Sequence, residues 1–217
     1  MQAGLTCPRP AGAVLDGRYA RLAPLAAVHA PALYEASTGA GAAERFAYLP
    51  DLPPATTADM AAWIAKATAG GDPLFSAVID KASGRAAGRQ ALMRIVPEHG
   101  VIEIGNILWG PDIARTRVAT EALYLAARHV FEDLGYRRFE WKCNDRNEPS
   151  KAAARRFGFS YEGLFRQHMW VKGVNRDTAW FSMLDSEWPG FRREYDRWLE
   201  PSNFDAAGKQ KSKLQVL

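Results

Sequence analysis

The sequence predicts an α/β fold in which an antiparallel meander comes first and a strand–helix–strand crossover follows. Three apolar runs, 74–80, 85–96 and 101–110, are separated only by the turn sequences KASG and PEHG, as is typical of antiparallel strands. The next run, 118–134, has apolar residues at i, i+3, i+4 and i+7, which is the spacing of an amphipathic helix. A buried-type strand at 137–143 then completes the crossover.

Further elements lie on either side of this pattern. Thr56 or Thr57 is expected to cap a helix that follows a proline-broken loop. The additional elements are predicted as a strand at 18–25, helices at 26–38 and 58–69, a short helix within NEPSKAAARRFGF, strands at YEGLFRQHMWVK and DTAWFSML, and a last amphipathic helix near 186–199.

A chain of 217 residues suits one domain with a full core. Residues 1–14 are rich in Pro, Gly and Ala and are expected to be loose, and 201–217 is expected to be a flexible tail without a core face. The domain is therefore predicted to span 15–200.

The composition excludes several classes of protein. It is 47% hydrophobic and 24% charged, with a net charge of +4, and the Lys and Arg residues are scattered rather than striped, which does not favour a nucleic-acid partner. No apolar run reaches about 18 residues, so no membrane span is expected. The two cysteines, Cys7 and Cys143, and the lack of a secretory leader indicate a cytoplasmic protein without disulfides. No cluster has metal-ligand spacing, so no metal is expected.

The most informative stretch is the basic turn IARTRVATEAL at 113–123. Arginines at the positive end of a helix are unfavourable unless an anion binds there. A strand, a turn of basic and small residues, and then a helix form an arrangement that holds a pyrophosphate, because the amides of the first helical turn point at the ligand. Arg115 and Arg117 would add charge-assisted hydrogen bonds. The alternative is a solvated loop whose arginines pair with Asp112 or Glu121.

Neither GxGxxG nor GxxxxGK[ST] occurs at this turn, which disfavours a Rossmann or P-loop protein. Instead, residues 15 to 185 resemble the GNAT N-acetyltransferases, in particular the RimJ/RimL-like branch, which acetylates protein N-termini and various small amines. The family's Gln/Arg-x-x-Gly-x-Gly/Ala turn corresponds to 114–119, followed by Thr-Glu-Ala at 120–122. Here Ala114 replaces the first residue and Arg117 the central Gly, and we interpret Arg117 as a side-chain replacement for part of the backbone cradle.

A second motif strengthens the resemblance. The family pattern Asn-x-x-Ser…Gly-Phe-x-x-Glu-Gly is matched at Asn147, Ser150, Gly158, Phe159, Glu162 and Gly163. The resemblance implies a mixed, mostly antiparallel sheet of six to seven strands, splayed in the middle and flanked by helices. It also implies acetyl-CoA as co-substrate. The residues implied to bind it are Ile107, Leu108 and Trp109 for the pantetheine arm, then Arg115, Thr116, Arg117, Val118, Ala119 and Thr120, and also Asn147 and Ser150.

Amine acetylation needs a polarised carbonyl, a deprotonated amine and a neutralised leaving thiolate. Many family members use a Tyr seven residues after the motif Asn, but that position is Ala154, so Ser150 is the candidate proton donor. The alternative is that Ser150 completes a helical turn and that Asn147 is its N-cap. Glu103 and His168 are the candidate bases, and each has a structural role as its alternative.

The loop 44–54 is the expected wall of an acceptor site, with Tyr48, Leu49 and Trp170 as lining residues; the alternative is aromatic packing under a long loop. We therefore predict an acetyl-CoA-dependent N-acetyltransferase that acts by direct attack in a ternary complex. The competing hypotheses are a non-catalytic acyl-CoA-binding or sensing module and a nucleic-acid-binding protein. Protein N-termini, polyamines, aminoglycosides and amino acids all remain open as acceptors, and the terminal helix and tail could support a homodimer.

Overall fold

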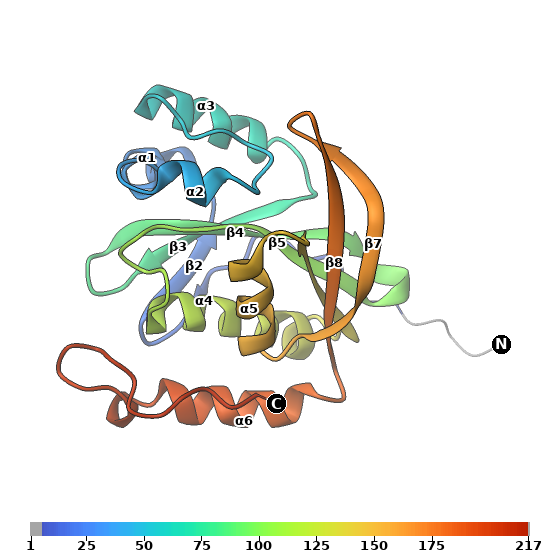
Figure 1. Cartoon of the computed structure of the whole chain (residues 1–217). Coiled ribbons are helices and arrows are strands. Elements are labelled where there is room, and N and C mark those ends of the chain that lie inside the picture. Colours follow the sequence, from blue (N-terminus) through green and yellow to red (C-terminus); the bar gives the residue numbers. More distant parts are fainter. Residues whose placement is uncertain (1–5, 217) are drawn as a thin grey trace. The chain divides into compact units, whose positions relative to one another are not determined.

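A computed structural model describes residues 6–216. These residues form two compact units. The N-terminal unit comprises Pro10–Ile95 and Ile104–Ala126, and the C-terminal unit comprises residues 6–9, Val96–Glu103 and 127–216. Figure 1 shows the helices and strands of both units.

Over the described residues the strands form one eight-stranded, mostly antiparallel sheet in the order β1-β2-β3-β4-β5-β6-β8-β7. The strands are β1 (Leu15–Asp16), β2 (Ala20–Pro24), β3 (Leu74–Asp80), β4 (Arg85–Val96), β5 (Val101–Trp109), β6 (Arg138–Asn144), β7 (Ser160–Val171) and β8 (Val174–Leu184). The predicted α/β class with a mostly antiparallel sheet is confirmed. The sheet exceeds the predicted six to seven strands, and the two-residue β1, which pairs with β2, was not predicted.

In the N-terminal unit, α1 (Ala30–Ser37), α2 (Ala42–Phe46) and α3 (Thr57–Ala67) follow β2. Helix α4 (Arg117–Arg128) follows β5 and belongs to this unit except for its last two residues. Leu33 of α1 and Ile64 of α3 share a buried cluster with Ala77 of β3, so the apolar faces of these helices cover the sheet. Thr56 is the N-cap of α3, and it forms a capping box with Asp59. The short helix α2 lies at the start of the segment predicted to be a loop.

The predicted helix at 118–134 changes its geometry near its end. After α4, a π-helical turn runs over His129–Asp133, in which the Leu134 amide donates to the His129 carbonyl at 3.0 Å. The π turn therefore replaces the last α-helical turn of the predicted element.

The C-terminal unit contains β6, β8 and β7, together with α5 (Glu148–Arg156) and α6 (Trp188–Leu199). One face of β6 places Phe139 and Trp141 in an aromatic core with Phe157 and Phe159. From α6, the buried Tyr195 hydroxyl donates to the Phe157 carbonyl at 3.0 Å. The amphipathic pattern of α6 is thus satisfied by packing against the segment after α5.

Both ends of the described chain make contacts. Of the segment 1–14 that was predicted to be loose, residues 1–5 lie outside the described residues, while Cys7 is buried and its amide donates to the Pro97 carbonyl at 3.2 Å. Of the predicted tail 201–217, residue 217 also lies outside. In contrast to the predicted lack of a core face, Asn203 and Val216 are buried, and the Ser212 amide donates to the Asn203 side chain.

Within residues 6–216, none of the helices combines the length and the apolar character needed to cross a bilayer.

Candidate active site

The basic turn connects β5 to α4 within the N-terminal unit, and its backbone is left-handed at Arg115, where φ is +65°. Arg115 is exposed. The Thr116 hydroxyl accepts a hydrogen bond from the Val118 amide at 3.1 Å, which makes Thr116 the cap of α4. The first bond of the helix runs from the Thr120 amide to the Thr116 carbonyl at 3.3 Å, so the amides of residues 117–119 precede it in the turn.

Arg117 is the first residue of α4, and it is not among the residues with positive φ. Sequence comparison placed the family's central glycine at position 117, but the left-handed conformation is adopted at Arg115 instead. The guanidinium carbon of Arg117 lies 4.3 Å from the centroid of the Tyr19 ring, a cation–π contact. Glu121, which could have paired with the arginines, accepts hydrogen bonds from the Arg18, Tyr19 and Ala20 amides.

The end of β5 is held close to β4. A Cβ atom at Gly110 would lie 2.8 Å from the Ala87 carbonyl oxygen, so only glycine fits there without a shift. The buried Gln90 of β4 accepts from the Trp109 indole at 3.3 Å and donates to the Ala122 carbonyl at 3.0 Å. Gln90 thereby ties the predicted pantetheine strand (Ile107, Leu108 and Trp109) to α4.

In the C-terminal unit, the second motif starts helix α5. The Asn147 side chain accepts from the Ser150 amide at 3.1 Å, so Asn147 is the N-cap of α5. The Ser150 hydroxyl oxygen accepts from the Trp141 indole at 3.0 Å. Burial raises the pKa of the Cys143 thiol, and Ser150 acts against this rise. The indole donor therefore orients the Ser150 hydroxyl oxygen.

Glu103 is buried and belongs to an ionic chain within the C-terminal unit. The Lys142 ammonium lies 3.1 Å from the Glu103 carboxylate and 2.7 Å from that of Glu140. The Arg138 guanidinium contacts Glu140 at 2.8 Å and also pairs with Glu162. Glu103 is thus one end of a ladder of alternating charges that crosses β5, β6 and β7, and we refer to these five residues as the charge ladder.

His168 lies on β7 beside a register shift between Phe165 and Met169. Gln167 there has φ of +51°, and this bulge turns His168 so that Nδ1 is 3.0 Å from the Thr178 hydroxyl. Its ring centroid is 6.0 Å from that of Trp180, whose ring lies 3.7 Å from the Lys142 ammonium. The two predicted bases, Glu103 and His168, are therefore linked through Lys142 and Trp180.

Comparison with known proteins identifies the family. The model of the "Acetyltransferase (GNAT) domain" family matches residues 20–160, which is more than half of the chain. The chain belongs to the GNAT family.

GNAT proteins of known structure are similar along most of the chain. A GCN5-related N-acetyltransferase from Brucella melitensis is 56% identical, with a TM-score of 0.96, and the match covers 99% of this chain and 98% of that one. A probable GNAT acetyltransferase from Chromobacterium violaceum ATCC 12472 is 40% identical, with a TM-score of 0.79, over 87% of this chain and 94% of that one. These matches confirm the predicted family and its fold.

The predicted RimJ/RimL-like branch is also supported. The Bacillus subtilis (strain 168) protein named ribosomal N-acetyltransferase YdaF is 33% identical over 73 residues, which are 34% of this chain. The chain spans only 40% and 63% of the lengths of the two curated relatives that it matches.

The predicted acceptor residues of this GNAT protein fall in different units. Tyr48 and Leu49 lie in the N-terminal unit after α2, with Tyr48 exposed and Leu49 half-buried, whereas Trp170 lies on β7 of the C-terminal unit and is 74% exposed. Their role stays a prediction.

The sequence analysis did not identify Arg89 or its partner Asp51, which lies on the same loop as Tyr48. The Arg89 side chain is buried on β4 and pairs with Asp51 at 2.9 Å. Burial lowers the pKa of Arg89 to about 10, and Asp51 acts against this shift. The sequence contains a sign of this pair, because Arg89 and Gln90 lie between apolar residues in the middle of the predicted strand 85–96, and a polar pair inside a strand is informative when it is buried.

Among the described residues, no group of three or more His, Cys, Asp or Glu side chains is placed to hold a metal ion. Both cysteines are buried as free thiols, and burial raises the pKa of Cys7 and of Cys143. A buried thiol with a raised pKa is a poor nucleophile.

Proposed function

We propose that this protein is an acetyl-CoA-dependent N-acetyltransferase that moves an acetyl group to a primary amine by direct attack in a ternary complex. The amine is either a protein N-terminus or a small molecule. The observation that carries the proposal is the turn before α4, because a capped helix start, a left-handed Arg115 and the small residue Ala119 suit the binding of a diphosphate.

The turn fits the diphosphate of acetyl-CoA chemically. The amides of Arg117 and Ala119 supply donors, and Arg115 and Arg117 supply positive charge beside them. Thr116, Val118 and Thr120 complete the cradle, while the backbone of Ile107, Leu108 and Trp109 is proposed to hold the pantetheine arm. When bound, acetyl-CoA supplies an acetyl thioester with a thiolate leaving group.

The acceptor ammonium must lose two protons as its nitrogen forms the amide bond and the thioester C–S bond breaks. One proton ends on the thiol of CoA and the other passes to solvent. Ser150 is proposed to donate to the leaving sulfur, and the hydrogen bond that its oxygen accepts from the Trp141 indole supports this role because it leaves the hydroxyl proton to be donated. Asn147 holds the turn that carries Ser150. The inert cysteines favour direct transfer over an acyl-enzyme.

The second proton needs a base, and Glu103 and His168 remain the candidates. Lys142 keeps the Glu103 carboxylate paired, whereas His168 is exposed and has Thr178 as its partner. His168 is therefore the more accessible of the two to a substrate or to water, and an imidazole is well suited to accept a proton near neutral pH.

The cofactor part of the proposal is tested by calorimetry with CoA. Replacing both Arg115 and Arg117 with Ala should weaken binding at least about tenfold, roughly 1.4 kcal/mol. The matched control replaces the exposed Lys209 and Lys211 with Ala, which removes the same charge and should leave the affinity unchanged. Equal affinity in both double variants would refute the phosphate-binding role of the turn.

The catalytic part is tested by thiol release from acetyl-CoA with a panel of amines and N-terminal peptides. Ser150→Ala should lower turnover by about 10² while CoA affinity changes little. His168→Gln should abolish the pH dependence of kcat if His168 is the base, and Glu103→Gln should do so if Glu103 is. CoA binding without thiol release to any amine would instead indicate a non-catalytic acyl-CoA-binding module.

A further inference from the structure

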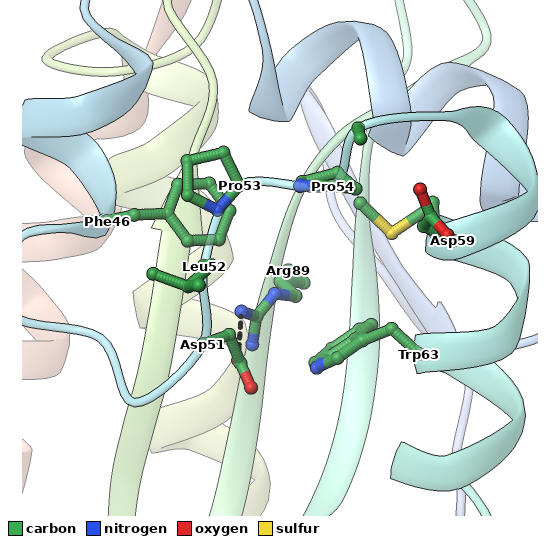
Figure 2. Close-up of a pocket in the computed structure, with 10 residues that line it drawn as sticks. Phe46, Asp51, Leu52, Pro53, Pro54, Asp59, Trp63 and Arg89 are labelled. Carbon is green, nitrogen blue, oxygen red and sulfur yellow. Dashed lines mark hydrogen bonds and ion pairs between the residues drawn. The ribbon is translucent and has the colours of Figure 1, made fainter. Parts of the chain in front are cut away.

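A cavity of about 330 Å³ lies within the N-terminal unit, lined by the segment from α2 to α3, by the first half of α3 and by Arg89 of β4. Figure 2 shows the side chains that surround it. Its walls are mostly apolar, formed by Phe46, Leu52, Pro53, Met60 and Trp63 among others. This volume and this composition are those of a small-molecule site that holds one apolar group.

The polar groups of the cavity are few and are largely engaged. The Nη2 atom of Arg89 donates to the Oδ2 atom of Asp51 at 2.9 Å, and the guanidinium stacks 4.0 Å from the centroid of a Trp63 ring. The carboxylate of Asp59 accepts from the amide and the hydroxyl of Thr56 in the capping box. Asp51 keeps 29% of its side chain exposed, so its second oxygen is left as an acceptor for a single cation.

One residue that lines the cavity, Arg89, contacts the strand proposed to present the acetyl group. Nη1 of Arg89 donates to the Asn106 carbonyl at 3.2 Å. Asn106 has φ of +50°, and Ile107, the first residue of the proposed pantetheine stretch, follows it directly. Arg89 therefore joins the cavity to the backbone next to the proposed pantetheine stretch, and all of these residues belong to the N-terminal unit.

We propose that this cavity selects the acceptor: it binds the aromatic side chain of a primary amine, and Asp51 receives the ammonium group. This inference rests on the proposed function, since it names the acceptor class of that same reaction. The aromatic group would contact Phe46, Leu52 and Trp63, where ring packing and apolar burial favour it. The Arg89–Asp51 pair fixes the carboxylate, so the ammonium meets an oriented acceptor.

The same cavity disfavours polyamines and aminoglycosides. Such molecules carry several positive charges along a polar chain, and each charge that enters an apolar cavity needs a carboxylate partner. Here Asp51 is shared with the buried cation of Arg89, and Asp59 accepts two hydrogen bonds from Thr56 through its Oδ2 atom. The other walls are mostly apolar, so the remaining charges of such a molecule would have no partner, and one ammonium with one apolar group is favoured.

The test measures binding and turnover separately on the full chain. Calorimetry with 2-phenylethylamine, with and without CoA, should show binding that propylamine and spermidine do not match. In thiol release, kcat/KM for 2-phenylethylamine should exceed that for propylamine, spermidine and kanamycin by at least about tenfold. A short peptide that begins with Phe is the second arm, and it distinguishes an N-terminal aromatic residue from a free aromatic amine as the natural source.

A cavity-filling variant makes the site itself testable. Leu52 lines the cavity and is 74% exposed, so Leu52→Trp can fill the space from outside the core. It should weaken 2-phenylethylamine binding at least about tenfold while CoA affinity stays unchanged. The matched control is Val28→Trp, an equally exposed site outside the cavity lining, which should change neither.

The outcomes separate the two proposals. If 2-phenylethylamine does not bind, if Leu52→Trp leaves its binding intact, or if spermidine or kanamycin is preferred, the aromatic acceptor site is wrong, even when CoA binds and other amines are acetylated. If 2-phenylethylamine binds with the predicted sensitivity to Leu52→Trp but no amine releases thiol, the cavity assignment is supported and the proposed catalytic function fails.

Discussion

The two units bury charge in different ways. In the N-terminal unit, Arg89 is a single buried cation, and Asp51 is its carboxylate partner. In the C-terminal unit, Lys142 lies between Glu103 and Glu140 in the charge ladder, so the loss of one carboxylate leaves the other in place. Because an unpaired buried charge is far more unfavourable than a weakened pair, we expect the single pair to be more sensitive to substitution than the ladder.

The largest effect is expected for Asp51→Ala. It leaves Arg89 buried without a carboxylate, and the free energy of unfolding should fall by about 3 kcal/mol. The control is Arg85→Ala, which breaks the exposed ion pair between Arg85 and Glu35 and should reduce stability by less than about 1 kcal/mol. Urea denaturation measures both, and similar losses would show that Arg89 does not depend on Asp51.

The ladder should respond less strongly. In Glu103→Gln, the amide can still hydrogen-bond and Lys142 retains Glu140 at 2.7 Å, so the expected loss is about 1.5 kcal/mol. Urea denaturation under the same conditions as for Asp51→Ala gives the ratio of the two losses in unfolding free energy directly. If Glu103→Gln lowered the free energy of unfolding as much as Asp51→Ala, the remaining Glu140 would not compensate Lys142 for the loss of Glu103.

Uncharged N-cap residues, one in each unit, allow the stability effects of substitution to be compared without buried charge. Thr56 caps α3 in one unit and Asn147 caps α5 in the other. Replacing each with Ala should lower the unfolding free energy by about 1 kcal/mol. If the two values differ strongly, the units differ in more than the way they bury charge, and the comparison above would have to be corrected for that difference.

The smallest effect is expected at the exposed end of the ladder. The hydrogen bond from Arg138, with a further one from Ser182, lowers the pKa of Glu162. A lowered folded-state pKa stabilises the fold above the unfolded-state pKa, and this contribution is lost as the pH falls through the folded value. Glu162→Gln should therefore destabilise the protein by less than about 1 kcal/mol at pH 7, with a difference that shrinks towards pH 3. A difference that grows on acidification would contradict the assignment.

Local signals in the sequence were sufficient for most of the fold. Strands β3 and β4 begin and end where the apolar runs and the turns KASG and PEHG predict, and Thr56 caps α3 as expected. The failures concern conformations and pairings that no local pattern encodes. The left-handed residue of the basic turn is Arg115 rather than position 117, because the start of α4 is fixed by the Thr116 cap.

The candidate site was predicted less completely than the fold. Glu103 and His168 were identified by residue type, but Lys142 and Trp180, which link them, come from separate strands. Arg89 and Asp51 are 38 positions apart, and only folding brings them together. Spacing in one sequence therefore indicates which side chains are chemically able to act, whereas their partners depend on long-range contacts.

Gln90 holds in place the two elements on either side of the turn before α4. Its amide holds the Trp109 indole on one side and the Ala122 carbonyl on the other, so the strand before the turn and the helix after it are clamped by one uncharged side chain. If the turn binds a diphosphate as proposed, the anion would meet donors that are already in position, and little conformational entropy of the protein would be lost on binding. Because the Gln90 side chain carries no charge, its two hydrogen bonds should be insensitive to salt. The attraction of the arginines for an anion, in contrast, should be screened by salt.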